Sequence, residues 1–174
     1  TNVGALNLSK LGQTKLSKEK RDMAYRLMKV HQEMGCVPTW TCAPYQAGAR
    51  PSFGQQVAWG ESNAVAFTNS ILGARTNRYG DFLDIACAIS ARAPYYGLHR
   101  SENRTAKLML DVSNLSNKLL QEDAFFPVLG SMVGKLTGET VSVVHGLPNN
   151  VTEDQMKALC AGAASTGSVG LVHL

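Results

Sequence analysis

The sequence lacks the features that define several large classes of protein. No apolar run in its 174 residues approaches the roughly 18 residues that a membrane-spanning helix needs, so we expect a soluble protein. Only 17% of the residues are charged and 44% are hydrophobic, which excludes intrinsic disorder and a solvated charged rod. The net charge of +4 is too small to indicate a nucleic-acid partner.

Common catalytic and export signals are missing as well. The chain contains no P-loop, GxGxxG, GxSxG or HExxH motif, which excludes the commonest nucleotide-binding and hydrolase classes. No hydrophobic segment follows the first residues, although a chain that begins with Thr1 could have lost a leader. Without an export signal, we expect a cytoplasmic protein whose cysteines are reduced thiols or iron ligands. The four are scattered and form no CxxC pair: Cys36, Cys42, Cys87 and Cys160.

The hydrophobic pattern predicts an α/β fold over residues 1–174, as a single domain or a fragment of one. Helices are expected over 17–34, from 61 or 62 to 72, over 81–92, within 123–136 and from 152 to 167. Extended segments are expected over 37–42, 106–112, 140–145 and 169–174. The last two strands and the helix between them form a βαβ unit, so these strands should be parallel.

One candidate for chemistry is the thiol of Cys42, at the end of an extended run. Pro44 stiffens the loop that follows, so the thiol would be held at a defined position, as a metal ligand or a nucleophile requires. On pattern alone, a small buried hydrophobic residue explains Cys42 better.

Two further loops and a histidine are polar enough to bind a ligand. Residues 59–64 place acidic and amide groups at a helix start, where a carboxylate or phosphate could bind, although on pattern alone an ordinary N-cap explains them better. Residues 73–78 carry two arginines that could contact an anion, with a solvated turn as the alternative. His99 could act as an acid, a base or an orienting group.

In these loops the sequence resembles the catalytic large part of the aconitase X family. The similar segments are 38–45, 59–64, 73–77, 84–99, 123–130 and 146–174, and they are distributed over essentially the whole chain. The resemblance implies aconitase-like α/β layers, completed by a small swivelling domain or subunit that is absent here. It also implies an iron–sulfur-dependent hydro-lyase acting on a small hydroxy acid. That acid is cis-3-hydroxy-L-proline in bacteria or mevalonate 5-phosphate in archaea, and residues 79–84 look closer to the bacterial kind.

The resemblance also suggests roles for individual residues. Cys42 would hold the cluster, and Glu61 and His99 would be catalytic. Substrate-binding roles fall to Tyr45, Ser62, Asn63, Arg75, Thr76 and Asn77. The other cysteines match no family segment, so two cluster ligands and a catalytic serine are expected outside this sequence, and the isolated chain should be inactive. The alternative of another class is a metal-free module that binds an anion or scaffolds a partner.

Overall fold

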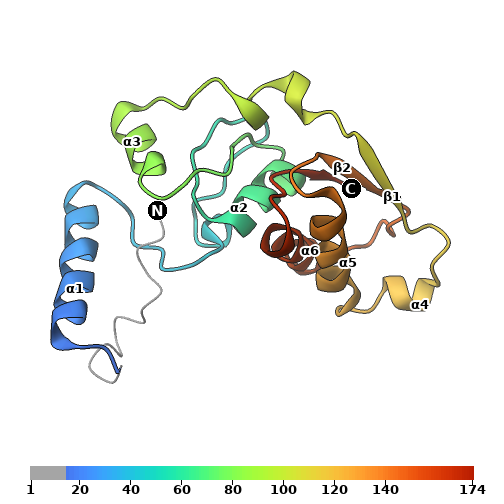
Figure 1. Cartoon of the computed structure of the whole chain (residues 1–174), viewed down its shortest axis with the longest axis horizontal. Coiled ribbons are helices and arrows are strands. Elements are labelled where there is room, and N and C mark those ends of the chain that lie inside the picture. Colours follow the sequence, from blue (N-terminus) through green and yellow to red (C-terminus); the bar gives the residue numbers. More distant parts are fainter. Residues whose placement is uncertain (1–14) are drawn as a thin grey trace.

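A parallel sheet lies at one end of the computed structural model, which describes residues 15–174 (Figure 1). Within this range the strands are β1 (Leu108–Asp111), β2 (Ser142–His145) and β3 (Val172–His173), in the order β1-β2-β3. Leu110 pairs with Val144, and Ser142 pairs with Val172. The sheet is parallel throughout, so the predicted α/β class is confirmed.

Two helices, α5 (Phe125–Thr137) and α6 (Glu153–Thr166), pack against each other and cover the sheet (Figure 1). The side chain of Thr152 accepts a hydrogen bond from the Gln155 amide, and the Gln155 side chain accepts one from the Thr152 amide. This capping box starts α6 as predicted, and β2, α6 and β3 form the expected parallel βαβ unit. The fully buried members of this core include Phe126, Val133, Val144, Leu159 and Val172.

The first part of the chain lies at the other end of the molecule and contains three helices (Figure 1). They are α1 (Lys18–Glu33), α2 (Ser62–Phe67) and α3 (Leu83–Ser90), and α2 continues as a π-helical turn, η3 (Thr68–Leu72). Ser17 caps α1, and Gly73 ends η3 with φ +67°, as the sequence predicted. Buried residues of α2 pack on α6, so this helix joins the two parts of the molecule.

The structure differs from the expected elements in several places. Residues 37–42 form no strand, because Trp40 takes a left-handed conformation with φ +48° and interrupts the extended run. Helix α3 is shorter than expected, since Phe82 and Ala91 at its two ends also have positive φ. The last strand has only two residues, and a short helix, α4 (Asn117–Leu120), was not expected.

Helix α1 is amphipathic, as expected, but its apolar side chains are not packed. Met23, Leu27, Val30 and Met34 are all exposed, and His31 is the buried residue of this helix. Among residues 15–174, no helix combines the length and apolar character that a membrane span requires.

The contact between α5 and α6 generates a testable prediction about stability. A Cβ added at Gly130 would overlap the backbone carbonyl of Leu159, so Gly130→Ala should lower the free energy of unfolding by about 2 kcal/mol or more. Gly80→Ala is the matched control, because a Cβ there meets nothing within 4 Å. Urea denaturation of both variants measures the difference, and equal stabilities would contradict the packing described.

Candidate functional site

A cavity of about 620 Å³ lies between the C-terminal end of α1, the irregular segment 36–49, the loop 58–61 and α3. It brings together two of the three loops that the sequence singled out, because Cys42 and Glu61 both line it. Asp84 of α3 and His31 of α1 line it too. Because Cys36 lines it as well, the cavity combines two thiols, two carboxylates and an imidazole from four segments of the chain.

The Cys42 loop is held in place by the residues that follow the cysteine. The backbone amide of Ala43 donates to the Thr41 hydroxyl at 3.0 Å. Tyr45 is buried, and its ring stacks on Phe67 of α2 with 4.1 Å between the ring centroids. Tyr45 thus anchors the loop to the core, while the side chain of Cys42 stays at the cavity wall.

The thiol of Cys42 interacts directly with the carboxylate of Glu61. Partial burial, the negative charge of Glu61 and a hydrogen bond from the thiol to that carboxylate all raise the pKa of Cys42 above its ordinary value. The sulfur is therefore protonated at neutral pH in the metal-free chain. A cation bound beside it would favour the thiolate instead, with Glu61 placed to receive the proton.

Glu61 sits at the start of α2 in a setting crowded with carboxylates. A Cβ at Gly60 would lie 3.6 Å from side-chain oxygens of both Asp81 and Asp84. Ser62 and Asn63 form the first turn of α2 and are half-buried. The side-chain oxygen Oδ1 of Asn63 is buried without a hydrogen-bond partner among the described residues.

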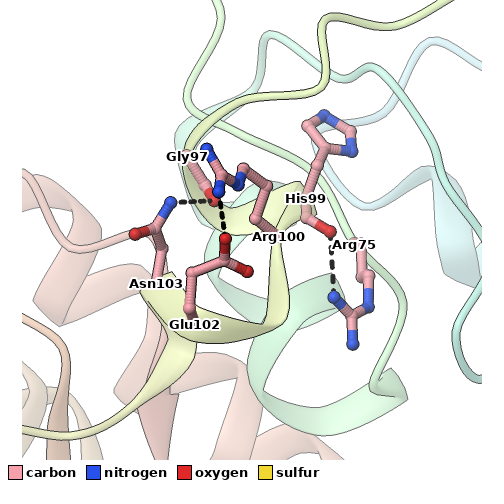
Figure 2. A network of polar contacts seen from close by, with 6 residues as sticks. All are labelled: Arg75, Gly97, His99, Arg100, Glu102 and Asn103. Atoms are coloured by element: carbon pink, nitrogen blue, oxygen red, sulfur yellow. Dashed lines mark hydrogen bonds and ion pairs between the residues drawn. The ribbon is translucent and has the colours of Figure 1, made fainter.

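The structure places the arginine turn outside the cavity wall, in a supporting position. Arg75 donates to the backbone carbonyl of His99 at 2.9 Å (Figure 2). The side-chain amide of Asn77 donates to the Tyr96 carbonyl, and its oxygen accepts from the Leu98 amide at 2.7 Å. These groups bind the neighbouring loop 96–101 of the same chain.

Thr76 connects the same turn to the cavity. Its hydroxyl accepts a hydrogen bond from the backbone amide of Trp59 at 3.3 Å, two residues before Glu61. Thr76 is fully buried, so it holds the Trp59–Glu61 segment in place from the interior of the protein.

His99 is buried, at 3% exposure, and does not line the cavity. Its Nδ1 lies 2.5 Å from Oε1 of Gln56, an atom that can only accept, so this nitrogen carries the proton. Its Nε2 then accepts from the Tyr79 hydroxyl at 2.6 Å. Burial and the charges of Arg104 and Arg75 lower the pKa of His99, so the ring is neutral and both nitrogens are engaged. Figure 2 shows the ring turned away from the Arg100–Glu102 and Gly97–Asn103 contacts.

Two of the charged or polar residues at the cavity were not singled out from the sequence. Asp84 falls in the first turn of a helix, where a carboxylate is expected for the helix dipole alone, so the sequence carries no separate signal. His31 lies on a helix face that the sequence analysis took as solvated.

The structure offers Cys42 as one candidate thiolate ligand for an iron–sulfur cluster. Within residues 15–174, no three His, Cys, Asp or Glu side chains are arranged to hold a metal ion. Cys42 is a free thiol at the wall of a cavity, which suits one thiolate ligand. The remaining ligands would have to come from elsewhere.

Comparisons with known proteins point to one family. The family model described as the first domain of aconitase X matches residues 1–102, and that of the second domain matches residues 106–174. The crystal structure of the holo-form of Thermococcus kodakaraensis aconitase X superposes with a TM-score of 0.81 at 39% identity, covering 91% of this chain and 40% of that one.

Curated relatives fall into two named activities. The cis-3-hydroxy-L-proline dehydratase of Hypocrea jecorina is 42% identical over 154 residues, covering 88% of this chain and 26% of that protein. The dehydratase of the same name from Pseudomonas aeruginosa is 40% identical, covering 87% of this chain and 26% of that protein. The phosphomevalonate dehydratase large subunit of Thermococcus kodakarensis is 42% identical, covering 85% of this chain and 37% of that protein. The chain thus spans only part of each of these relatives.

The contact between Cys42 and Glu61 predicts how the thiol should react. Glu61→Gln removes the negative charge, so the pKa of Cys42 should fall toward its ordinary value. The thiolate fraction at pH 8 should then rise, and alkylation of Cys42 by iodoacetamide at that pH should be faster than in the unsubstituted chain. The measurement is best made in a Cys36→Ser background, because Cys36 is the other exposed thiol of the four cysteines. An unchanged rate would show that the two groups do not interact.

Proposed function

The chain belongs to the aconitase X family, and we propose that it forms part of a hydro-lyase that removes water from cis-3-hydroxy-L-proline. The observation that carries this proposal is the pairing of the Cys42 thiol with the Glu61 carboxylate at the wall of one cavity. A dehydratase of this kind needs a metal ligand and a base within reach of the same substrate, and these two residues meet that need.

In the proposed mechanism, Cys42 is one thiolate ligand of an iron–sulfur cluster. When bound, such a cluster supplies a Lewis acid for the substrate carboxylate and the leaving hydroxyl group. Glu61 then takes the proton from the carbon next to the one that bears the hydroxyl. The electron pair of that C–H bond forms the new double bond as the C–O bond breaks. The leaving hydroxide takes a proton from solvent and is released as water, and Glu61 returns its own proton to solvent, so that one water is lost for each substrate.

We propose different roles for the other predicted site residues, according to where they lie relative to the cavity. Ser62 and Asn63 are beside Glu61, and the unpartnered Oδ1 of Asn63 supports a substrate-binding role. We assign a positioning role to Tyr45, which anchors the Cys42 loop. The same role is proposed for four residues that hold the loops behind the cavity: Arg75, Thr76, Asn77 and His99.

Mevalonate 5-phosphate is the second candidate substrate, because the Thermococcus kodakarensis large subunit is as similar, at 42% identity, as the hydroxyproline dehydratases. A metal-free anion-binding module has less support. Arg75, which would capture the anion, donates instead to the His99 carbonyl and the Ser101 hydroxyl.

We further propose that a partner domain or subunit completes the enzyme. The chain spans 26% to 40% of the relatives named above, and among residues 15–174 no three suitable side chains are grouped to hold a metal ion. The two missing ligands would come from the part of the large subunit outside this sequence, and the small swivelling domain would supply a catalytic serine. The exposed free thiols of Cys36 and Cys42 favour a reducing, cytoplasmic location.

The proposed function is tested in the full-length protein after reconstitution with iron and sulfide. The unsubstituted protein should show visible charge-transfer absorption and should dehydrate cis-3-hydroxy-L-proline faster than mevalonate 5-phosphate. Cys42→Ser should lower the cluster content, whereas Glu61→Gln should keep the cluster and lower kcat by about 100-fold or more.

Cys36→Ser is the control, because Cys36 lines the same cavity and has no predicted role in cluster binding. Full cluster content in Cys42→Ser would refute the ligand assignment. Exclusive turnover of mevalonate 5-phosphate would refute the proposed substrate.

A further inference from the structure

We propose that one face of α1 is the docking surface for the part of the large subunit that lies outside this sequence. This face, the apolar stripe, consists of Met23, Leu27, Val30 and Met34. The choice of occupant rests on the proposed function, because it follows from the ligands that an iron–sulfur cluster would need.

The spacing and exposure of the apolar stripe are the first observation. Its residues are separated by four, three and four positions, which places all of them on one side of a helix. They are between 40% and 64% exposed, and none belongs to the core around α5, α6 and the sheet or to the cluster that joins α2 to α6. A surface helix normally buries such a stripe, and an exposed apolar patch indicates an interaction surface.

The apolar stripe is not the side of α1 that faces the cavity. Met28, His31 and Gln32 line the cavity. With 3.6 residues per turn, these three positions lie roughly 120° around the helix axis from the stripe. Helix α1 lies at the edge of the molecule, at the opposite end from the sheet (Figure 1). One side of the helix therefore belongs to the cavity, and a second side presents the stripe to a partner.

Exposed apolar side chains continue past the end of α1 toward the cavity. Val37 is 81% exposed and Trp40 is 46% exposed, and both line the cavity wall. The same wall carries Cys42. A polypeptide that covers the apolar stripe and the segment after it would therefore reach the wall that holds the candidate cluster ligand.

The length of the relatives identifies the occupant. The chain covers 40% of the Thermococcus kodakaraensis aconitase X structure and 37% of the phosphomevalonate dehydratase large subunit, so more than half of each lies outside the matched part.

The cavity gives that outside part a reason to lie beside α1. Among residues 15–174, no three side chains are grouped to hold a metal ion, so further ligands must reach the cluster that Cys42 would bind. The proposed function places two of them in the outside part of the large subunit. The polypeptide that carries them must approach the wall formed by α1 and the segment 36–42. We infer that it presents apolar side chains to the stripe and thiolates to the cavity.

The first test measures whether the apolar stripe is covered in the full-length protein. Met23→Cys places a thiol on the stripe. Lys29→Cys is the matched control, because Lys29 lies on the polar side of the same helix with its side chain 76% exposed. Labelling by a maleimide is followed by peptide mass spectrometry, which separates each new thiol from the native ones. We expect Met23→Cys to label about tenfold more slowly than Lys29→Cys, or slower still, and the two rates to converge in urea.

The second test identifies what covers the stripe and needs no substitution. Photo-methionine, a diazirine analogue, is incorporated at Met23 and Met34 together with the other methionines of the full-length protein, and ultraviolet light cross-links it to its neighbours. We expect cross-links from these two positions to peptides of the same large subunit outside this sequence. Cross-links only to a second copy of α1, or only to the small swivelling domain, would overturn the proposed occupant.

Neither measurement depends on iron or on turnover, so this inference and the proposed function fail separately. Equal labelling of Met23→Cys and Lys29→Cys, in a protein that binds the cluster and dehydrates hydroxyproline, would overturn the docking surface and leave the proposed function intact. A protected stripe cross-linked to the outside part, in a protein that takes up no cluster, would support the docking surface and refute the proposed function.

Discussion

The arrangement of the site depends on the side chain of Asn69, which is 2% exposed in the π-helical turn η3. Its amide nitrogen lies 2.8 Å from the Thr76 carbonyl and 2.9 Å from the Gly170 carbonyl, and its oxygen accepts from the Thr76 amide and the Arg104 guanidinium. One buried amide thus joins the arginine turn to the segment that leads into β3. Without these contacts, several backbone groups would be buried without partners, which is far more costly than the loss of one exposed hydrogen bond.

From Asn69 a continuous path of contacts leads to the cavity. Asn69 holds Thr76, the hydroxyl of Thr76 holds the amide of Trp59, and Trp59 is followed by the turn that carries Glu61. Glu61 in turn contacts Cys42. The polar loops therefore divide into two groups with different physical tasks: one forms the cavity wall, and the other holds that wall in position. Rigid support of this kind is what a base and a metal ligand need in order to act on the same substrate.

The cavity wall itself is unusual in what it leaves unsatisfied. His31 of the wall and Asn63, which follows Glu61 in α2, each have a buried polar atom without a partner among the described residues. Trp40 of the wall has a positive φ, as do Phe82 and Ala91 at the two ends of α3. Unpaired polar atoms and strained backbone both cost folding free energy. These costs fall on the cavity wall at His31 and Trp40, and also on other parts of the fold, such as the buried hydroxyl of Ser142 in β2.

Local patterns in the chain were enough to predict the α/β class, the capping box of α6, the parallel βαβ unit and the left-handed Gly73, because each depends on residues close together in the sequence. Cys42 and Glu61 became candidates through the family resemblance of their loops, because pattern alone favoured a buried hydrophobic residue and an ordinary N-cap. Whether a candidate side chain lines the cavity depends on contacts between segments that are distant in the sequence. Arg75 and His99 look like ligand-binding residues in sequence, but their partners, Ser101 and Gln56, lie 26 and 43 residues away and engage their polar groups. Asp84 and His31 look ordinary in sequence, and only the packing of α3 and α1 around the Cys42 loop brings them to the cavity. The sequence alone determines which chemical groups a side chain carries. Whether those groups are available to bind a ligand depends on which distant residues the tertiary structure places beside them.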